Sequence, residues 1–169
     1  MPTTTSRLPD RRDALLIAAA AVAVNLIGAI GVPFTTVESA WFASLELPAF
    51  YPPGWAFGVV WPILYALCGA GAALVYLAGR DGAAAGGRVR GALALFGVQL
   101  AVNVAWSPVF WGLERPDLGL VVLGVLLPLV AATIRAFDRV DRRAAALLVP
   151  YLAWVCFATA LNYAIWALN

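Results

Sequence analysis

The chain has 169 residues, of which 63% are hydrophobic and 12% are charged, with a formal net charge of +2 and no histidine. A soluble domain needs about a quarter of its residues charged to cover its surface, so this composition excludes an ordinary soluble globule. It predicts an all-α integral membrane protein, because a helix satisfies its own backbone hydrogen bonds in lipid.

Five stretches without charged residues follow one another along the chain, and each can hold a spanning helix of about 20 apolar residues. We predict a five-transmembrane-helix bundle, with residues 1–12 as a disordered N-terminal tail and 13–169 as one transmembrane domain. The predicted helices cover roughly residues 14–34, 53–78, 89–111, 118–137 and 144–168.

The first loop, residues 35–52, is the longest and is rich in aromatic side chains, among them Trp41, Phe42, Phe50 and Tyr51. Two interpretations fit this composition. The side chains form an aromatic belt at the level of the lipid headgroups, or the loop is a lid that folds over a cavity.

Arginine placement predicts the orientation. All 11 basic residues are arginines, and only Arg115 lies on the side of the first and third loops. Because basic residues stay in the cytoplasm, we expect the N-terminus inside and the C-terminus outside. The arginines lie in short loops without a folded basic surface, which argues against nucleic-acid binding.

The sequence offers little conventional chemistry. Without histidine, a histidine-ligated metal and a histidine-based catalytic triad are excluded, and we predict no metal site and no obligatory cofactor. Cys68 and Cys156 lie inside the second and fifth spans, where we interpret them as small apolar packing residues. No ionisable residue lies at mid-membrane depth, which disfavours a proton-coupled pump.

Aromatic and amide side chains recur together at helical spacing, so that they share faces of three spans. Such polar groups either bond between helices or, with the aromatic rings, line a slot for a flat apolar ligand. We interpret Asn25 as a residue that forms an interhelical hydrogen bond. For the polar and aromatic residues on the other faces, both alternatives stay open. Those faces carry Trp61 and Tyr65 in the second span, Gln99, Asn103, Trp106 and Phe110 in the third, and Tyr151, Trp154, Ala158, Leu161, Asn162 and Ile165 in the fifth.

Three stretches carry a family resemblance. They are WFASL at 41–45 with PPGW at 52–55, QLAVN at 99–103 with Trp106, and PYLAW at 150–154 through LNY at 161–163. In these motifs the chain resembles the TspO/MBR family, the tryptophan-rich sensory proteins of bacteria and the mitochondrial translocator protein.

The resemblance implies a five-helix bundle, commonly dimeric, that binds porphyrins such as protoporphyrin IX in a pocket near the first loop. Sterols bind some members, but the basic residue of the mammalian sterol motif is replaced here by Ala167, after Trp166. By family pattern, Trp61 and Trp154 match pocket tryptophans associated with light-dependent porphyrin breakdown. Family pattern also implies lining positions at Gly31, Phe34, Phe57, Gly58, Val60, Asn103, Trp106, Ala158 and Leu161.

Our leading hypothesis is a binding protein, in which a tetrapyrrole stacks between the second, third and fifth helices. Trp41 and Tyr51 close over the ligand from the first loop, Tyr65 adds to the wall, and Asn103 and Asn162 orient ring substituents. The alternatives are light-dependent porphyrin degradation, with Trp61 and Trp154 as the reactive residues, and a transporter of porphyrin or lipid. An arginine-rich, lysine-free chain predicts the bacterial cytoplasmic membrane, and small residues on the third span leave a homodimer open.

Overall fold

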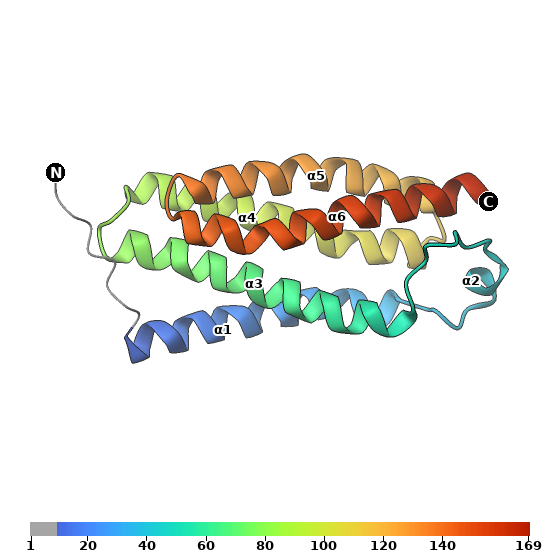
Figure 1. The fold of residues 1–169 in the computed structure, drawn as a ribbon, viewed down its shortest axis with the longest axis horizontal. Helices are drawn as coiled ribbons and strands as arrows, with labels where there is room; N and C mark the ends of the chain where they lie inside the picture. The colour runs from blue at the N-terminus through green and yellow to red at the C-terminus, as the bar shows by residue number, and fades with distance from the viewer. Residues whose placement is uncertain (1–9) are drawn as a thin grey trace.

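The computed structural model describes residues 10–169, and these residues form helices and connecting loops without a strand. The long helices run side by side along the longest axis, and the short helix α2 lies beyond one end of them (Figure 1). In chain order the elements are α1 (Arg11–Gly28), the 3₁₀ turn η1 (Ala29–Phe34), α2 (Ala40–Ser44), α3 (Gly54–Arg80), α4 (Gly86–Ser107), the π-helical turn η2 (Pro108–Gly112), α5 (Pro116–Asp138) and α6 (Arg142–Leu168).

Five of the helical segments are long and apolar enough to cross a bilayer, which confirms the predicted number of spans. The chain is therefore a multi-pass membrane protein whose outer faces contact lipid. The spans cover residues 11–34, 54–80, 86–112, 116–138 and 142–168, within a few residues of the predicted ranges. The first begins inside the predicted tail, and the rest of that tail, residues 1–9, lies outside the described residues.

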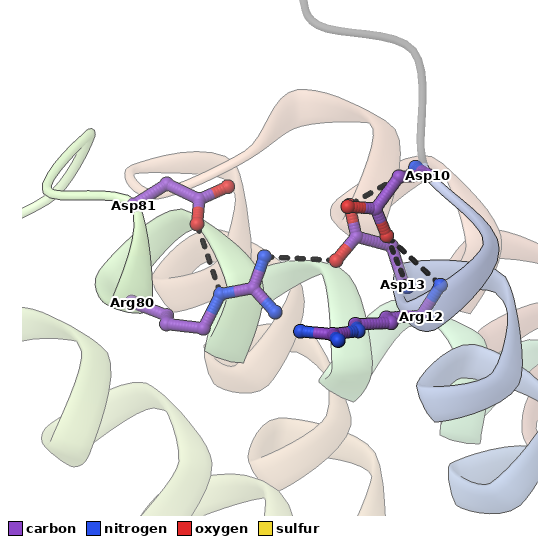
Figure 2. A network of polar contacts seen from close by, with 5 residues as sticks. All are labelled: Asp10, Arg12, Asp13, Arg80 and Asp81. Carbon is purple, nitrogen blue, oxygen red and sulfur yellow. Dashed lines mark hydrogen bonds and ion pairs between the residues drawn. The ribbon is translucent and has the colours of Figure 1, made fainter.

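The early start of α1 has a local cause. The carboxylate of Asp10 accepts hydrogen bonds from the backbone N–H groups of Arg12 and Asp13, and Asp13 bonds back to the N–H of Asp10 (Figure 2). This reciprocal arrangement is a capping box, which satisfies backbone donors that the first helical turn leaves free. It fixes the first turn at Asp10, although the neighbouring sequence is polar.

The same cap joins two helices. The guanidinium of Arg80, at the end of α3, donates to Asp13 at 2.8 Å and to Asp81 at 2.9 Å (Figure 2). Since Arg80 is 43% exposed, water weakens the charge interaction. The contact fixes the register of α1 against α3 more than it adds stability.

Glycine brings α1 and α3 together. At Gly69 in α3, an added Cβ would lie 2.5 Å from the carbonyl oxygen of Ala20 and 2.7 Å from the Cα of Ala21. Both neighbours are backbone atoms, so no side-chain rotation could relieve the overlap. Small residues at helix interfaces allow such close approach in lipid, where packing holds helices together.

The structure tests the interpretations of Asn25 and of the two cysteines. Asn25 donates to the carbonyl oxygens of Ala21 in its own helix and Pro62 in α3, which confirms the predicted interhelical bond. Cys68 packs in the core at 1% exposure, as predicted. The interpretation of Cys156 as an internal packing residue is wrong, because it lies on the outer face of α6 and is exposed.

We expect Gly69→Ala to lower thermal stability by about 1–3 kcal/mol, because the new methyl group must push α1 away from α3. The measurement is thermal unfolding in detergent, followed by helical circular dichroism. Gly124→Ala in α5 is the matched control, because nothing lies within 4 Å of the added Cβ there. Equal midpoints for the two variants would contradict the close α1–α3 contact.

Candidate ligand cavity

A cavity of about 510 Å³ lies at the end of the bundle that carries the first loop. Its walls come from all five spans and from the loop itself. Of the residues singled out from the sequence, it is lined by Gly31, Phe57, Gly58, Trp61, Tyr65, Asn103, Trp106, Trp154, Ala158, Leu161 and Asn162.

Indole rings make up much of the wall. Trp61 of α3 and Trp154 of α6 meet almost perpendicularly, with ring centroids 6.4 Å apart. Trp61 also stacks on Tyr65 at 5.3 Å, one helical turn further along α3. On the opposite side, Trp106 stacks on Phe110 at 4.8 Å. Flat aromatic faces therefore surround the space, and such faces favour offset or edge contacts with another ring.

Buried amides hold two of these aromatic side chains in place. The hydroxyl of Tyr65 donates to Oδ1 of Asn103 at 2.6 Å. The indole N–H of Trp106 donates to Oδ1 of Asn162 at 3.0 Å, and Nδ2 of Asn162 donates to the carbonyl oxygen of Pro116 at 2.8 Å. The two alternatives for Asn103 and Asn162 are therefore compatible, because each side chain bonds between helices and also lines the cavity.

Two enclosed donors have no acceptor among residues 10–169: the indole N–H of Trp154 and the amide nitrogen of Gln99. Gln99 accepts a hydrogen bond from the hydroxyl of Tyr151 at 3.0 Å, but it does not line the cavity. Trp154 does line it. An enclosed donor without a partner is costly, and a molecule in the cavity with an acceptor atom could satisfy the one on Trp154.

The first loop covers the cavity end of the bundle. Phe42 of α2 packs on Trp111 with ring centroids 4.6 Å apart, and Tyr51 packs on Phe57 at 5.8 Å. Both Phe42 and Tyr51 line the cavity. The loop thus folds back over the helix ends.

Asn169, directly after α6, holds the first loop in place. The side chain of Asn169 accepts from the backbone N–H of Glu46 at 2.9 Å and donates to the carbonyl oxygen of Glu46 at 3.1 Å. Asn169 is anchored in turn to the carbonyl oxygen of Ile165 in α6. These bonds join the middle of the loop to the end of α6.

None of the lining residues in the described chain is charged. Burial raises the pKa of the Tyr51 hydroxyl above its usual value of 10.0, so this side chain stays neutral at physiological pH. The polar lining groups are amides, hydroxyls and indole N–H groups. The cavity therefore suits a largely apolar molecule with a few hydrogen-bonding atoms.

Three residues predicted to bind the ligand do not line the cavity. Phe34 follows Gly31 by one 3₁₀ turn, and its ring lies beside Gly112 of η2 instead. Val60 packs on the main core, because neighbouring positions on a helix point in different directions. Trp41 contacts the rings of Phe110 and Trp111 from outside the cavity.

Other lining residues were not anticipated. Asn25 lines the cavity in addition to its interhelical bond, and Gly28 and Ser107 contribute where α1 and η1 approach Tyr65 and α4. An added Cβ on Gly28 would overlap the Tyr65 ring. The signal in the sequence was the small-residue character of α1, which does not reveal which helix it faces.

Comparison with known proteins gives a consistent result. The model of the TspO/MBR family matches residues 17–167. The chain is 40% identical to the tryptophan-rich protein TspO of Archaeoglobus fulgidus, over 92% of this chain and 97% of that protein. It is 41% identical to the protein CrtK of Rhodobacter capsulatus, over 88% and 89% of the two chains. It is also 41% identical to the human translocator protein, over 76% and 75%. The chain belongs to the TspO/MBR family.

Proposed function

We propose that this TspO/MBR-family membrane protein binds a porphyrin, such as protoporphyrin IX, in the cavity beneath the first loop, and that it serves in tetrapyrrole sensing or regulation. The observation that carries the proposal is a cavity without charged lining residues whose walls include Trp61, Trp106 and Trp154. One similar protein, from Cereibacter sphaeroides, is named a tryptophan-rich sensory protein and is 37% identical over 88% of this chain.

Size and chemistry support a planar aromatic ligand. The cavity volume of about 510 Å³ lies within the range of small-molecule sites, about 300–1,000 Å³. A flat macrocycle gains stacking contacts with indole faces in addition to apolar burial. A polar ring substituent could accept from the indole N–H of Trp154, which has no other acceptor among the described residues.

The tryptophans on α3 provide a sharp test. We expect Trp61→Phe to weaken protoporphyrin IX binding about 3- to 10-fold, because an aromatic contact contributes about 0.5–1.5 kcal/mol beyond its buried area. The measurement is quenching of tryptophan fluorescence during titration of the purified protein. Trp55→Phe is the matched control, since Trp55 is on the same helix but is 71% exposed and outside the cavity.

Two results would contradict the proposal in different ways. Absence of quenching in the unaltered protein at micromolar protoporphyrin IX would overturn the proposed function. Equal affinities for Trp61→Phe and Trp55→Phe would place the ligand away from the indole walls.

Light-dependent breakdown of the bound porphyrin is a second candidate, with dioxygen as the oxidant. The supporting observation is the contact between Trp61 and Trp154, with Tyr65 stacked on Trp61. An indole beside an excited porphyrin is an electron donor, so the reaction would depend on the ligand's own photochemistry.

We expect the double variant Trp61→Phe/Trp154→Phe to slow the light-dependent loss of porphyrin absorbance several-fold, measured per bound porphyrin. Trp55→Phe again serves as the control, and a dark sample accounts for spontaneous loss. If the double variant and the control bleach at the same rate under illumination, these indoles take no part in breakdown.

We infer that the membrane is the bacterial cytoplasmic one, with the start of α1 inside and the end of α6 outside. Of the ten arginines among residues 10–169, only Arg115 lies at the end where α6 finishes, and basic residues are retained on the cytoplasmic side. Alkaline phosphatase fused after Asn169 should therefore be active, because that enzyme works only outside the cytoplasm. Activity from a fusion after Arg80, and none after Asn169, would reverse the topology.

A further inference from the structure

The cavity is open to its surroundings along one line. The exposed lining residues all belong to two segments, whereas the lining residues of α4, η2, α5 and α6 are buried or half-buried. On one side of this line lie Ala29, Val32, Thr35 and Val37, at the end of α1 and in the chain that follows. On the other side lie Gly54, Gly58 and Pro62, in the first turns of α3. We call this line the seam.

The seam exists because α1 and α3 separate. They are held together as far as the bond from Asn25 to Pro62. Beyond it, η1 turns toward α4, where an added Cβ on Gly31 would lie 2.8 Å from Oγ of Ser107. On the α3 side, no atom of residues 10–169 lies within 4 Å of an added Cβ at Gly58. The departure of η1 thus leaves the first turns of α3 without a neighbour on that side.

The inner part of the seam, at Gly58 and Pro62, lies at the depth of lipid, whereas Thr35 and Val37 belong to the first loop. The second span, α3, begins at Gly54 and has 27 residues, so it is longer than the roughly 30 Å of hydrocarbon and its first turn lies near the lipid headgroups. At about 1.5 Å per residue, Gly58 lies about 6 Å and Pro62 about 12 Å further in. Next to them, Val59 is 50% and Ile63 is 54% exposed, as expected for side chains that contact acyl chains. An opening at this depth faces the lipid of one leaflet.

In contrast to the seam, the side of the cavity that faces water is covered by the first loop. The ring contacts of Phe42 with Trp111 and of Tyr51 with Phe57 lie over the cavity. Two hydrogen bonds between Glu46 and Asn169 fix the loop to α6. A ligand arriving from water would have to break these contacts, whereas passage through the seam breaks none of them.

We propose that the cavity takes up and releases its ligand sideways through the seam, from the lipid leaflet and not from water. This inference rests on the proposed porphyrin site and specifies its ligand class as membrane-dissolved molecules with an uncharged aromatic body. Because no lining residue is charged, any carboxylate on the ligand stays at the mouth of the seam, toward the lipid headgroups.

The test uses the full-length protein in phosphatidylcholine vesicles, with protoporphyrin IX supplied from donor vesicles and quenching followed in time. We expect Gly58→Leu, which narrows the seam, to slow association about tenfold and to slow dissociation as well. Loss of a wall contact alone would instead speed dissociation, so the sign separates an entrance from a wall. Gly97→Leu is the control, because it is an exposed glycine with an open Cβ position on α4 outside the cavity.

Asn169→Ala tests the other route by releasing the loop. We expect its rates to match those of the unaltered protein. Faster rates for Asn169→Ala, or unchanged or faster dissociation for Gly58→Leu, would overturn entry through the seam. Absence of any quenching in the unaltered protein would count against the proposed function instead.

A second readout needs no porphyrin. Brominated phosphatidylcholine quenches indoles that acyl chains can reach, and the difference between the unaltered protein and Trp61→Phe gives the contribution of Trp61. We expect such a contribution, reduced several-fold in Gly58→Leu. If lipid bromine does not quench Trp61, the seam is closed to the bilayer and the inference fails.

Discussion

A polar group inside a bilayer has no water to bond, so its partner must come from within the chain. The bundle meets this constraint largely by pairing amide with aromatic side chains across helices. Tyr65 donates to Asn103, and Trp106 donates to Asn162. Each bond fixes the orientation of a ring as well as satisfying a donor, so the same constraint that closes the bundle also holds flat aromatic faces around the cavity.

The exceptions to this pairing differ in meaning. Gln99 has one enclosed donor without an acceptor among residues 10–169, yet it lies outside the cavity and its oxygen already bonds Tyr151. The indole N–H of Trp154 is also unpaired, but it belongs to a lining residue. Only there can a bound molecule supply the missing acceptor. For Gln99 the structure offers no physical account.

How much of the fold could be predicted from the sequence depends on the length of each sequence pattern. Stretches of about 20 residues without charged side chains define the spans, because in lipid only helices satisfy their backbone hydrogen bonds within one segment. Helical spacing also groups Asn103 with Trp106, since residues three or four apart share a face. Spacing does not tell which helix covers that face. The position of Gly28 against Tyr65 therefore had no counterpart in the pattern.

Irregular backbone and loops limited the prediction in another way. The resemblance implied Phe34 as a lining position, but Phe34 lies in a 3₁₀ turn and its ring lies beside Gly112. Trp41 belongs to the first loop, which has no long periodic pattern from which its direction could be read. The resemblance also implied Val60, which packs against the core without lining the cavity. Sequence thus located the aromatic lining better than the segments that close it.

Glycine has opposite effects in the middle and near the start of α3, and this difference explains where the bundle can change shape. Gly69 is pressed against the backbone of α1, beyond which Arg80 joins the helix ends. Gly58 faces open space, and the irregular turns η1 and η2 both lie at that end. Backbone that departs from the α-helix is tolerated in membranes where it borders a cavity or is buried in protein. Because contacts are sparse along the seam, opening there costs less than separating the close-packed half, and shape changes on ligand entry should be concentrated at the cavity end.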